Sequence, residues 1–351
     1  MLKNFPKIHF GFHYSVTSFR NLLRLPETGR HVRMKSTNLI SGLKKSGLLV
    51  AFAVFLGAVS LTSDAFLSVG NILDVLRQVS ITGMIAIGTT FVVITGRLDL
   101  SVGSMLTLLT VLLVDQHNQV GPLLAIVLTL AAAIALGAFN GLLVGYLKLN
   151  ALIVTLAMLS FLQGLTLLYS GGSNVNIPNA QTSWFRFFGR SDMFGIPVPV
   201  LLFLGVGAIA AFVLTRTVFG RQVYAVGGNE TASNFSGVSS ARTVFWAYIL
   251  SALATGFAAI ILGSRVMGAQ NTIGQGYELT VLAGIILGGT SMLGGSGSVW
   301  RTVLGIAMLG FIQNGLLLMG FPYYVQWLVT WVVIIIAVWI DLAGKRGRVL
   351  A

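Results

Sequence analysis

Apolar runs long enough to cross a lipid bilayer dominate this chain. A transmembrane helix needs about 20 mostly apolar residues, and runs close to that length recur along the sequence. Only 9% of the 351 residues are charged, against roughly 25% in a soluble domain, so charges are too few to cover a water-facing surface. The sequence predicts an all-α integral membrane protein of about ten spanning helices, at residues 46–63, 79–96, 101–115, 121–147, 151–170, 197–215, 242–263, 277–292, 299–319 and 323–341.

Two of these runs are short for a full crossing. The runs at 101–115 and 277–292 could be tilted, broken or partly re-entrant, because irregular backbone is tolerated at membrane depth where protein surrounds it. Glycines recur in the fourth run at Gly137, Gly141 and Gly145, around Asn140. Small residues at this spacing predict a close seam between two helices.

Basic residues are spread unevenly among the gaps between the runs. Ten crossings with the N-terminus in the cytoplasm also place the C-terminus there, and eighteen of the 22 Lys and Arg residues then lie on the cytoplasmic side. This asymmetry is typical of proteins in a cell inner membrane, and it explains the net charge of +13 without nucleic-acid binding. Four basic residues fall outside: Arg77, Arg186, Arg190 and Arg265.

The chain divides into three parts by composition. Residues 1–44 form a cytoplasmic extension that we expect to be poorly ordered, and Met34 resembles an alternative natural start. Residues 45–342 form the transmembrane domain, with its longest internal cytoplasmic loop at 216–242, and residues 343–351 form a basic cytoplasmic tail.

The residues that could power or catalyse a reaction are scarce. The chain has no cysteine, its four histidines lie outside the apolar runs, and no metal site is expected. All nine acids, including Asp99, fall in loops or at helix ends, so no carboxylate for proton coupling is expected within the membrane. No phosphate-binding loop of the Gly-x-x-x-x-Gly-Lys type is present, so uphill transport would need energy from another polypeptide. Sodium coupling through backbone carbonyls stays open.

The 216–242 loop contains the signals of a short helix. Asn229 is a good N-cap, Glu230 suits the first turn, and Gly237 can end the helix in the left-handed conformation. We expect a two-turn helix along the membrane face with Ala232 and Phe235 near one side, which could dock a partner or be an ordinary amphipathic connector.

Several segments resemble the ribose-type ABC transporter permeases. Residues 224–230 (Tyr-Ala-Val-Gly-Gly-Asn-Glu), followed by Ser-Gly-Val at 236–238, resemble the coupling loop of that family, and residues 95–104 resemble its TGGIDLSVGS segment. Further matches lie at 274–279, 287–291, 294–298 and 312–316, so the resemblance covers about residue 45 to the end. Arg97 stands where the family usually has glycine, and Asn150 where proline often precedes the fifth span.

The resemblance implies a type II importer fold with two related halves and a set of partners. A second permease subunit, identical or paralogous, would complete the pore, and a periplasmic sugar-binding protein would deliver the substrate. A cytoplasmic ATP-binding subunit would bind the ATP and Mg, with no cofactor in this chain. That subunit would grip Phe235 in an apolar groove, with Glu230 and Asn229 on its rim, and the coupling residues would be Tyr224, Gly228, Asn229, Glu230, Ala232, Phe235 and Gly237.

Other residues carry alternative interpretations. Arg97, Asp99, Ser101 and Gly103 could set an inner gate or contact the ATPase, or Asp99 could simply cap a helix at Ser101 and Val102. Arg77, Arg186, Arg190 and Arg265 could meet carboxylates of the binding protein or anchor the interface. Thr155, Ser160 and Gln163 share one face of the fifth span and could line the pathway or hydrogen-bond between helices.

The expected function is a transporter subunit, not an enzyme, that translocates a monosaccharide or polyol. The identity of the sugar stays open, because in such systems specificity lies largely in the binding protein. The main alternative is a sodium-coupled secondary transporter. An intramembrane enzyme would need a nucleophile or metal cluster that the spans do not offer, and a passive channel would leave the coupling-type loop unexplained.

Overall fold

The computed structural model describes residues 52–178, 182–322, 324–332 and 335. The extension and tail expected at 1–44 and 343–351 lie outside the described residues. The chain divides into two units after Val54, and the arrangement below is that of the second unit, which begins at Phe55.

Helices account for most of the described residues. Six of them are long and apolar enough to cross a membrane. They are α2 (Val69–Ile94), α4 (Pro122–Gly141) with its π-helical continuation η1 (Leu142–Tyr146), α5 (Ala151–Ser170), α7 (Val198–Arg216), α10 (Ser240–Val266) and α12 (Val299–Leu318).

The remaining predicted runs form helices that do not meet those criteria. The run at 101–115 is α3 (Val102–Val120), whose last six residues, from Asp115, are mostly polar. The run at 277–292 ends early as α11 (Tyr277–Leu287), and the first run is the short helix Phe52–Thr62. The last run is helical at 324–332, and most of its remainder lies outside the described residues. The structure therefore supports a multi-span helical protein but not the count of ten.

Local capping explains where several helices begin and end. Asn150 accepts hydrogen bonds from the amides of Leu152 and Ile153 at the start of α5, and Gly171 ends that helix with a φ of 60°. Both bounds of α5 match the predicted run. Helix α2 instead begins ten residues before its predicted run, because Ser68 caps it. Asn71, Asp74 and Arg77 interrupt the apolar residues of its first turns, so hydropathy did not include them in the run.

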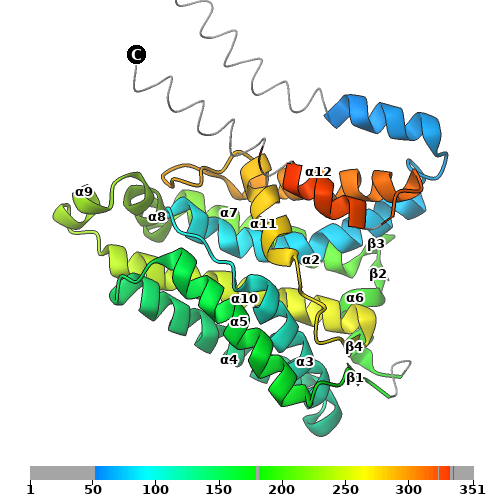
Figure 1. Ribbon diagram of the computed structural model, residues 1–351, viewed down its shortest axis with the longest axis horizontal. Helices are drawn as coiled ribbons and strands as arrows, with labels where there is room; N and C mark the ends of the chain where they lie inside the picture. The colour runs from blue at the N-terminus through cyan, green and yellow to red at the C-terminus, as the bar shows by residue number, and fades with distance from the viewer. Residues whose placement is uncertain (1–51, 179–181, 323, 333–334, 336–351) are drawn as a thin grey trace, which may run out of the picture. The chain divides into compact units, whose positions relative to one another are not determined.

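Helices α10 and α2 form the centre of the bundle (Figure 1). Helix α10 packs against α2, α3 and α4, while α2 also contacts α7, α11 and α12. Both central helices are mostly buried, which leaves α4, α5, α7 and α12 to form the outer surface. The central helices therefore carry apolar residues around their whole circumference.

The two ends of the bundle differ in structure (Figure 1). One end, called here the α8–α9 end, carries α8 (Val218–Gly228) and α9 (Glu230–Phe235). The other, the strand end, carries two short antiparallel pairs and two short helical turns. These are β1 (Val175–Asn176) with β4 (Gly268–Ala269), β2 (Asp192–Met193) with β3 (Ile196–Pro197), η2 (Trp184–Arg186) and α6 (Phe187–Arg190).

The predicted glycine seam joins α4 to α10. A Cβ on Gly137 would lie 2.6 Å from the Cβ of Ala252, and a Cβ on Gly141 would lie 2.8 Å from the carbonyl oxygen of Phe245. Gly145 meets the carbonyl of Ala241 in the same way. The two backbones therefore approach too closely for any larger side chain, as in other small-residue interfaces between membrane helices.

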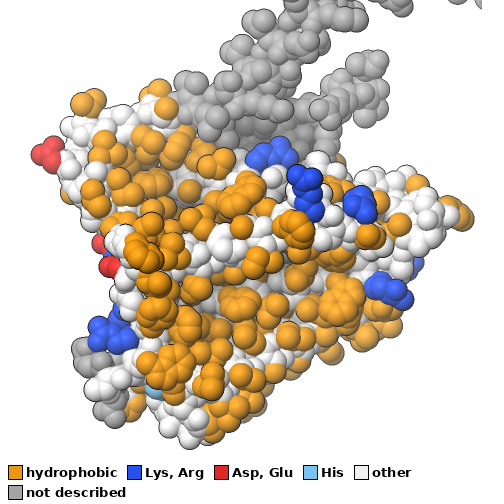
Figure 2. Space-filling view, turned by 180° about the vertical axis from the view of Figure 1, so that it is seen from behind, with side chains coloured by type: hydrophobic (Ala, Val, Ile, Leu, Met, Phe, Trp, Pro, Cys, Tyr) orange, Lys and Arg blue, Asp and Glu red, His pale blue; other side chains and the backbone are white. Residues whose placement is uncertain are grey.

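Apolar side chains cover most of the face of the bundle shown in Figure 2, and charged side chains on it are few. Large apolar residues are exposed along α4, α5 and α7, among them Val127, Ile134, Ile153, Phe161, Ile209 and Phe212. Such a surface fits lipid and would be a large apolar patch in water.

The charged residues of the described chain segregate between the two ends. Six basic residues gather at the α8–α9 end, namely Arg97, Lys148, Arg216, Arg221, Arg242 and Arg301. Four lie toward the strand end, namely Arg77, Arg186, Arg190 and Arg265. This is the grouping that the sequence predicts, although Arg77 lies within α2 and Arg265 within the last turn of α10 rather than in loops.

Candidate functional site

Helices α8 and α9 form a small capped unit at one end of the bundle. Asn229 accepts a hydrogen bond from the amide of Ala232 at 2.9 Å, and Gly237 follows α9 with a φ of 83°. The short helix predicted from these residues is therefore present. Helix α8 was missed, although Thr217 caps it and its buried Val223 and Val226 lie three residues apart.

The coupling residues predicted on α8 and α9 are mostly exposed. Phe235 has 90% of its surface exposed, which is unusual for a phenylalanine at a polar end of the molecule. Tyr224 and Glu230 are half-buried and attach this unit to the bundle. The other coupling residues are all exposed: Gly228, Asn229, Ala232 and Gly237.

The buried side of α8 packs against the end of α2 and against the glycine-rich loop before α12. The hydroxyl of Tyr224 donates to the carbonyl oxygen of Gly297 at 3.0 Å. Gly227 packs against the backbone of Ile94 and Gly295, where a Cβ would overlap main-chain atoms, and the amide of Gly295 donates to the carbonyl of Ile94 at 2.9 Å. The ends of α2 and α8 and the loop before α12 therefore meet main chain to main chain.

Arg97 links the end of α2 to α9. Its Nη2 donates to Oε2 of Glu230 at 2.8 Å, and its Nη1 donates to the carbonyl oxygen of Thr95 at 2.9 Å. Partial burial disfavours the charged form of Glu230, but the hydrogen bond and the charge of Arg97 outweigh it and lower the pKa of that carboxyl. The guanidinium thus fixes the first residue of α9 against the bundle.

The chain that follows Arg97 enters the interior of the bundle. The Asp99 carboxylate is 1% exposed and accepts hydrogen bonds from the amide and hydroxyl of Ser101, at 3.1 and 2.6 Å, and from the hydroxyl of Ser251 at 3.2 Å. The Ser101 hydroxyl also accepts from Asn140 Nδ2 at 2.9 Å. We call Asp99, Ser101, Asn140 and Ser251 the buried polar cluster.

The depth of this cluster corrects an expectation from the sequence. Ser251 lies eleven residues after the start of α10, which corresponds to about 16 Å along the helix axis at 1.5 Å per residue. The Asp99 carboxylate therefore lies beside the middle of α10, although the sequence predicted no carboxylate at membrane depth. Hydropathy places Asp99 in a loop correctly, but it cannot reveal that this loop folds back between helices. Of the two amides that Asp99 was expected to cap, at Ser101 and Val102, the structure shows the hydrogen bond from Ser101.

Gly103 lies one turn further along, at the start of α3. Its missing side chain leaves space for the loop before α11, because a Cβ there would lie 2.7 Å from the carbonyl oxygen of Gly274 and would overlap the Glu278 carboxyl. The Thr107 hydroxyl accepts from the amide of Gly274 at 3.0 Å. Residues from both halves of the sequence thus meet at the first turn of α3.

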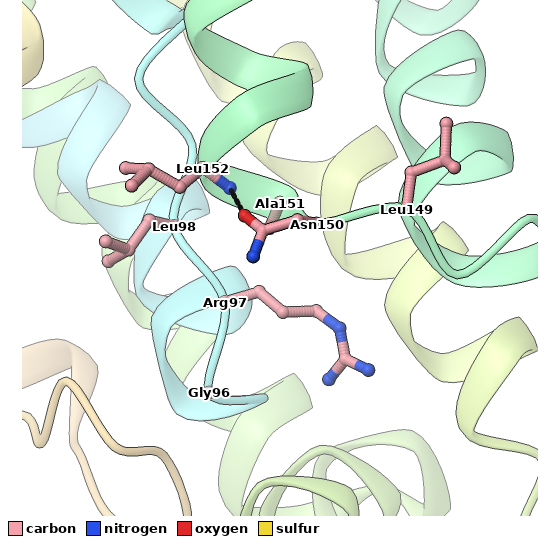
Figure 3. Close-up of a pocket in the computed structure, with 7 residues that line it drawn as sticks. All are labelled: Gly96, Arg97, Leu98, Leu149, Asn150, Ala151 and Leu152. Carbon is pink, nitrogen blue, oxygen red and sulfur yellow. Dashed lines mark hydrogen bonds between the residues drawn. The ribbon is translucent and has the colours of Figure 1, made fainter.

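A pocket of about 300 Å³ opens beside Arg97 at the start of α5 (Figure 3). It brings together Arg97 and Asn150, the two positions where the chain departs from the pattern that it resembles. Asn150 uses its side-chain oxygen to cap α5, as the dashed line to Leu152 marks. The lining residues are Gly96, Arg97, Leu98, Leu149, Asn150, Ala151 and Leu152.

The four arginines predicted to dock a binding protein lie near the strand end, where Arg77 and Arg190 make the following contacts. Arg77 pairs with Asp74 at 2.8 Å and with Asp192 at 2.7 Å. The guanidinium of Arg190 donates to the carbonyl of Arg265 at 2.8 Å and to that of Val266 at 3.3 Å, at the end of α10. Arg186 and Arg190 are exposed, whereas Arg77 and Arg265 are partly buried.

The three polar residues of α5 do not share one environment. Thr155 is buried and bonds back to the carbonyl of Ala151, while Ser160 is exposed. Gln163 is half-buried and donates to the carbonyl of Asn271 at 2.8 Å. The three residues therefore differ in burial within this chain. Across the described residues, no group of three or more acidic or histidine side chains could hold a metal ion.

The chain is similar in sequence to known transport proteins. Residues 71–338 match the family of the branched-chain amino acid transport system permease component. The ribose import permease protein of Bacillus subtilis (strain 168) is 40% identical over 301 residues, which cover 85% of this chain and 93% of that protein. Its counterpart in Escherichia coli (strain K12) is 38% identical over 296 residues, covering 84% and 92% of the two chains.

A xylose transport system permease protein of Escherichia coli (strain K12) is 31% identical over 384 aligned positions, covering 92% of this chain and 97% of that protein. No solved structure matches the chain. The relatives are transport subunits and not enzymes, and the apolar helices agree with that role. The chain belongs to the branched-chain amino acid transport system permease family, and within it to the ribose-type ABC permeases.

Proposed function

We propose that this chain is the membrane subunit of an ATP-driven importer that translocates a monosaccharide, such as ribose or xylose, or a polyol. The observation that carries the proposal is α9, a capped helix that presents an exposed Phe235 and is anchored to the bundle through Glu230. An exposed aromatic side chain on a short, firmly held helix is suited to insertion into an apolar groove of another protein. The names of the relatives supply the class of substrate.

The α8–α9 end faces the cytoplasm in this proposal. Its concentration of basic residues supports that orientation, because cytoplasmic segments carry an excess of Lys and Arg. Both termini lie in the cytoplasm, and the chain crosses the inner membrane about ten times in two related halves of the type II importer kind. Helix α3, with its polar last turns, and the short helix α11 are the least typical of these crossings.

An ATPase subunit binds α9 from the cytoplasm and holds the ATP and Mg. Phe235 enters its groove, Asn229 and Glu230 contact the rim of that groove, and Ala232 lies beside the aromatic ring. Tyr224 and Gly228 shape the approach, and Gly237 lets the chain turn back into α10. Closure of the ATPase pair on nucleotide then moves α9 relative to the bundle.

The strand end faces the periplasm and receives a sugar-binding protein. Arg77, Arg186, Arg190 and Arg265 offer positive charge to carboxylates of that protein, and Asp74 and Asp192 neutralise part of the charge of Arg77. A second permease subunit, identical or paralogous, completes the pore. Thr155, Ser160 and Gln163 remain candidates for the pathway, and the segment with Arg97, Asp99, Ser101 and Gly103 forms part of the inner gate.

One observation favours the alternative of a sodium-coupled transporter. Asp99 is a carboxylate buried beside the middle of α10, and acidic groups at such depth often serve ion coupling. The three hydrogen bonds that it accepts from serines satisfy much of its charge without an ion. The ATP-driven mechanism therefore accounts for more of the structure, since it also uses α9.

Reconstitution separates the two functions. The purified chain is placed in liposomes alone, and separately with an ATPase and a sugar-binding protein of the same organism, and uptake of labelled ribose and xylose is measured. We expect uptake only in the complete system and only with ATP. Accumulation of sugar by the chain alone under a sodium gradient would establish the alternative instead.

A further inference from the structure

The segment Gly96–Ser101, called here the connecting segment, contacts two parts of the molecule. One is the exposed helix α9, and the other is the pair Asn140 and Ser251, the members of the buried polar cluster that lie on α4 and α10. The connecting segment contacts both through its own side chains and carbonyls. A movement of α9 can therefore be transmitted to the interior through the connecting segment.

The outer attachment is the guanidinium of Arg97. This group bonds to Glu230 and to the carbonyl of Thr95 at the same time, so it is held at both its Nη atoms. Its side chain is 18% exposed, whereas that of Glu230 is 38% exposed, so water screens the pair only in part. Charge-assisted hydrogen bonds of this kind are short and directional.

The inner attachment uses three neighbouring residues of the connecting segment. The carbonyl of Leu98 accepts from the hydroxyl of Tyr248 at 2.8 Å, Asp99 accepts from Ser251, and Ser101 accepts from Asn140. The first two bonds reach α10 and the third reaches α4. The connecting segment is therefore fixed to two helices whose backbones are themselves in close contact along the glycine seam.

We propose that Arg97 is a positioning residue that transmits the movement of α9 through the connecting segment to the buried polar cluster. The inference rests on the proposed function, in which a partner ATPase moves α9. The contact of Gly227 with Ile94 supports α8, but among the described residues Arg97 forms the ion pair to α9 itself.

The link is tested first without any partner. Arg97→Gln, Glu230→Gln and the double variant are purified, and their thermal unfolding is measured. We expect the double variant to unfold at the same temperature as the less stable of the two single variants, because each single change already breaks the bond. Strictly additive losses would show that the two side chains do not interact. Arg216→Gln removes an exposed charge at the end of α7, so its effect should simply add to that of Glu230→Gln.

Transmission is tested in the reconstituted importer by the number of ribose or xylose molecules moved per ATP hydrolysed. Glu230→Gln is combined with Ser251→Ala, which removes a hydroxyl of the buried polar cluster. The matched control is Thr110→Val, which removes a buried hydroxyl that bonds only to the carbonyl of Leu106 in its own helix. Glu230 and Ser251 make no direct contact. Without transmission, the factors by which the two changes lower the number of sugar molecules moved per ATP should therefore multiply.

We expect the Glu230→Gln/Ser251→Ala pair to deviate from the multiplied effects by about threefold, while the pair with Thr110→Val does not. Multiplied effects in both pairs would overturn the inference and leave the proposed function intact. Failure of the proposed function looks different, because the wild-type chain would then show no ATP-dependent uptake.

Discussion

The hydroxyl of Tyr248, at the end of the first third of α10, donates to the carbonyl oxygen of Leu98 at 2.8 Å. The Tyr248 side chain is fully buried and Leu98 is half-buried, and a main-chain carbonyl that loses its donor away from water is costly. This bond holds the chain after α2 inside the bundle and keeps it from following the helix out at the α8–α9 end. The position of Asp99, one residue later, depends on it.

Tyr248→Phe should therefore destabilise the protein while preserving the packing of the ring. Removal of the hydroxyl leaves the Leu98 carbonyl without its donor, which typically costs about 1–3 kcal/mol. Thermal or denaturant unfolding of the purified chain measures this loss. Tyr146→Phe is the control, because Tyr146 is half-exposed on η1, and an unchanged stability for both variants would contradict the assigned bond.

The glycine seam predicts a position-dependent effect of alanine. Gly141→Ala places a methyl group 2.8 Å from the carbonyl oxygen of Phe245, so α4 and α10 must separate, at a cost of about 1–3 kcal/mol. Gly164→Ala on α5 meets no atom within 4 Å and should be neutral or slightly stabilising, since alanine favours helix. Unfolding temperatures of the two variants compare these positions directly, and equal losses would contradict the close approach of the helices.

The sequence predicted those features that local signals or spacing determine. The apolar run at 151–170 gave both bounds of α5, the cap at Asn229 and the turn at Gly237 predicted α9, and the four-residue glycine spacing predicted the seam. Each of these depends on a cap or a helical period that is readable from neighbouring residues.

Features set by contacts between distant residues were not predictable in this way. Hydropathy gives the length of a run but not the path of the chain after it, so the burial of Asp99 was missed. The pairing of Arg97 with Glu230 joins residues 133 apart in sequence, and the strands at the strand end have two residues each, too few for a pattern. Helix α8 lay in a loop with basic residues, where the Thr217 cap and the spacing of Val223 and Val226 were its signals.

The ion pair of α9 predicts a pH dependence of stability. The folded protein lowers the pKa of Glu230 below its ordinary value of 4.5, so the carboxylate stabilises the fold above that value. The contribution is lost as the pH falls below 4.5 through the folded-state pKa. We expect the difference in unfolding temperature between wild type and Glu230→Gln to be constant near pH 7 and to shrink below about pH 4.5. A difference that does not shrink at all between pH 4.5 and pH 3 would mean that charge does not hold α9.

Phe235 offers the sharpest test of α9 as the site of partner binding. Its side chain is 90% exposed and makes no contribution to the core, so Phe235→Ala should leave the unfolding temperature unchanged. An aromatic anchor buried at an interface is often worth 2 kcal/mol or more, so the affinity for the ATPase should fall by about thirtyfold. Titration of the ATPase against the purified chain in nanodiscs measures this. Phe194→Ala is the control, because Phe194 is 96% exposed at the strand end and should not affect ATPase binding. Equal affinities for wild type and Phe235→Ala would remove Phe235 from the interface, whereas an equal loss in both variants would indicate nonspecific association through exposed aromatic residues.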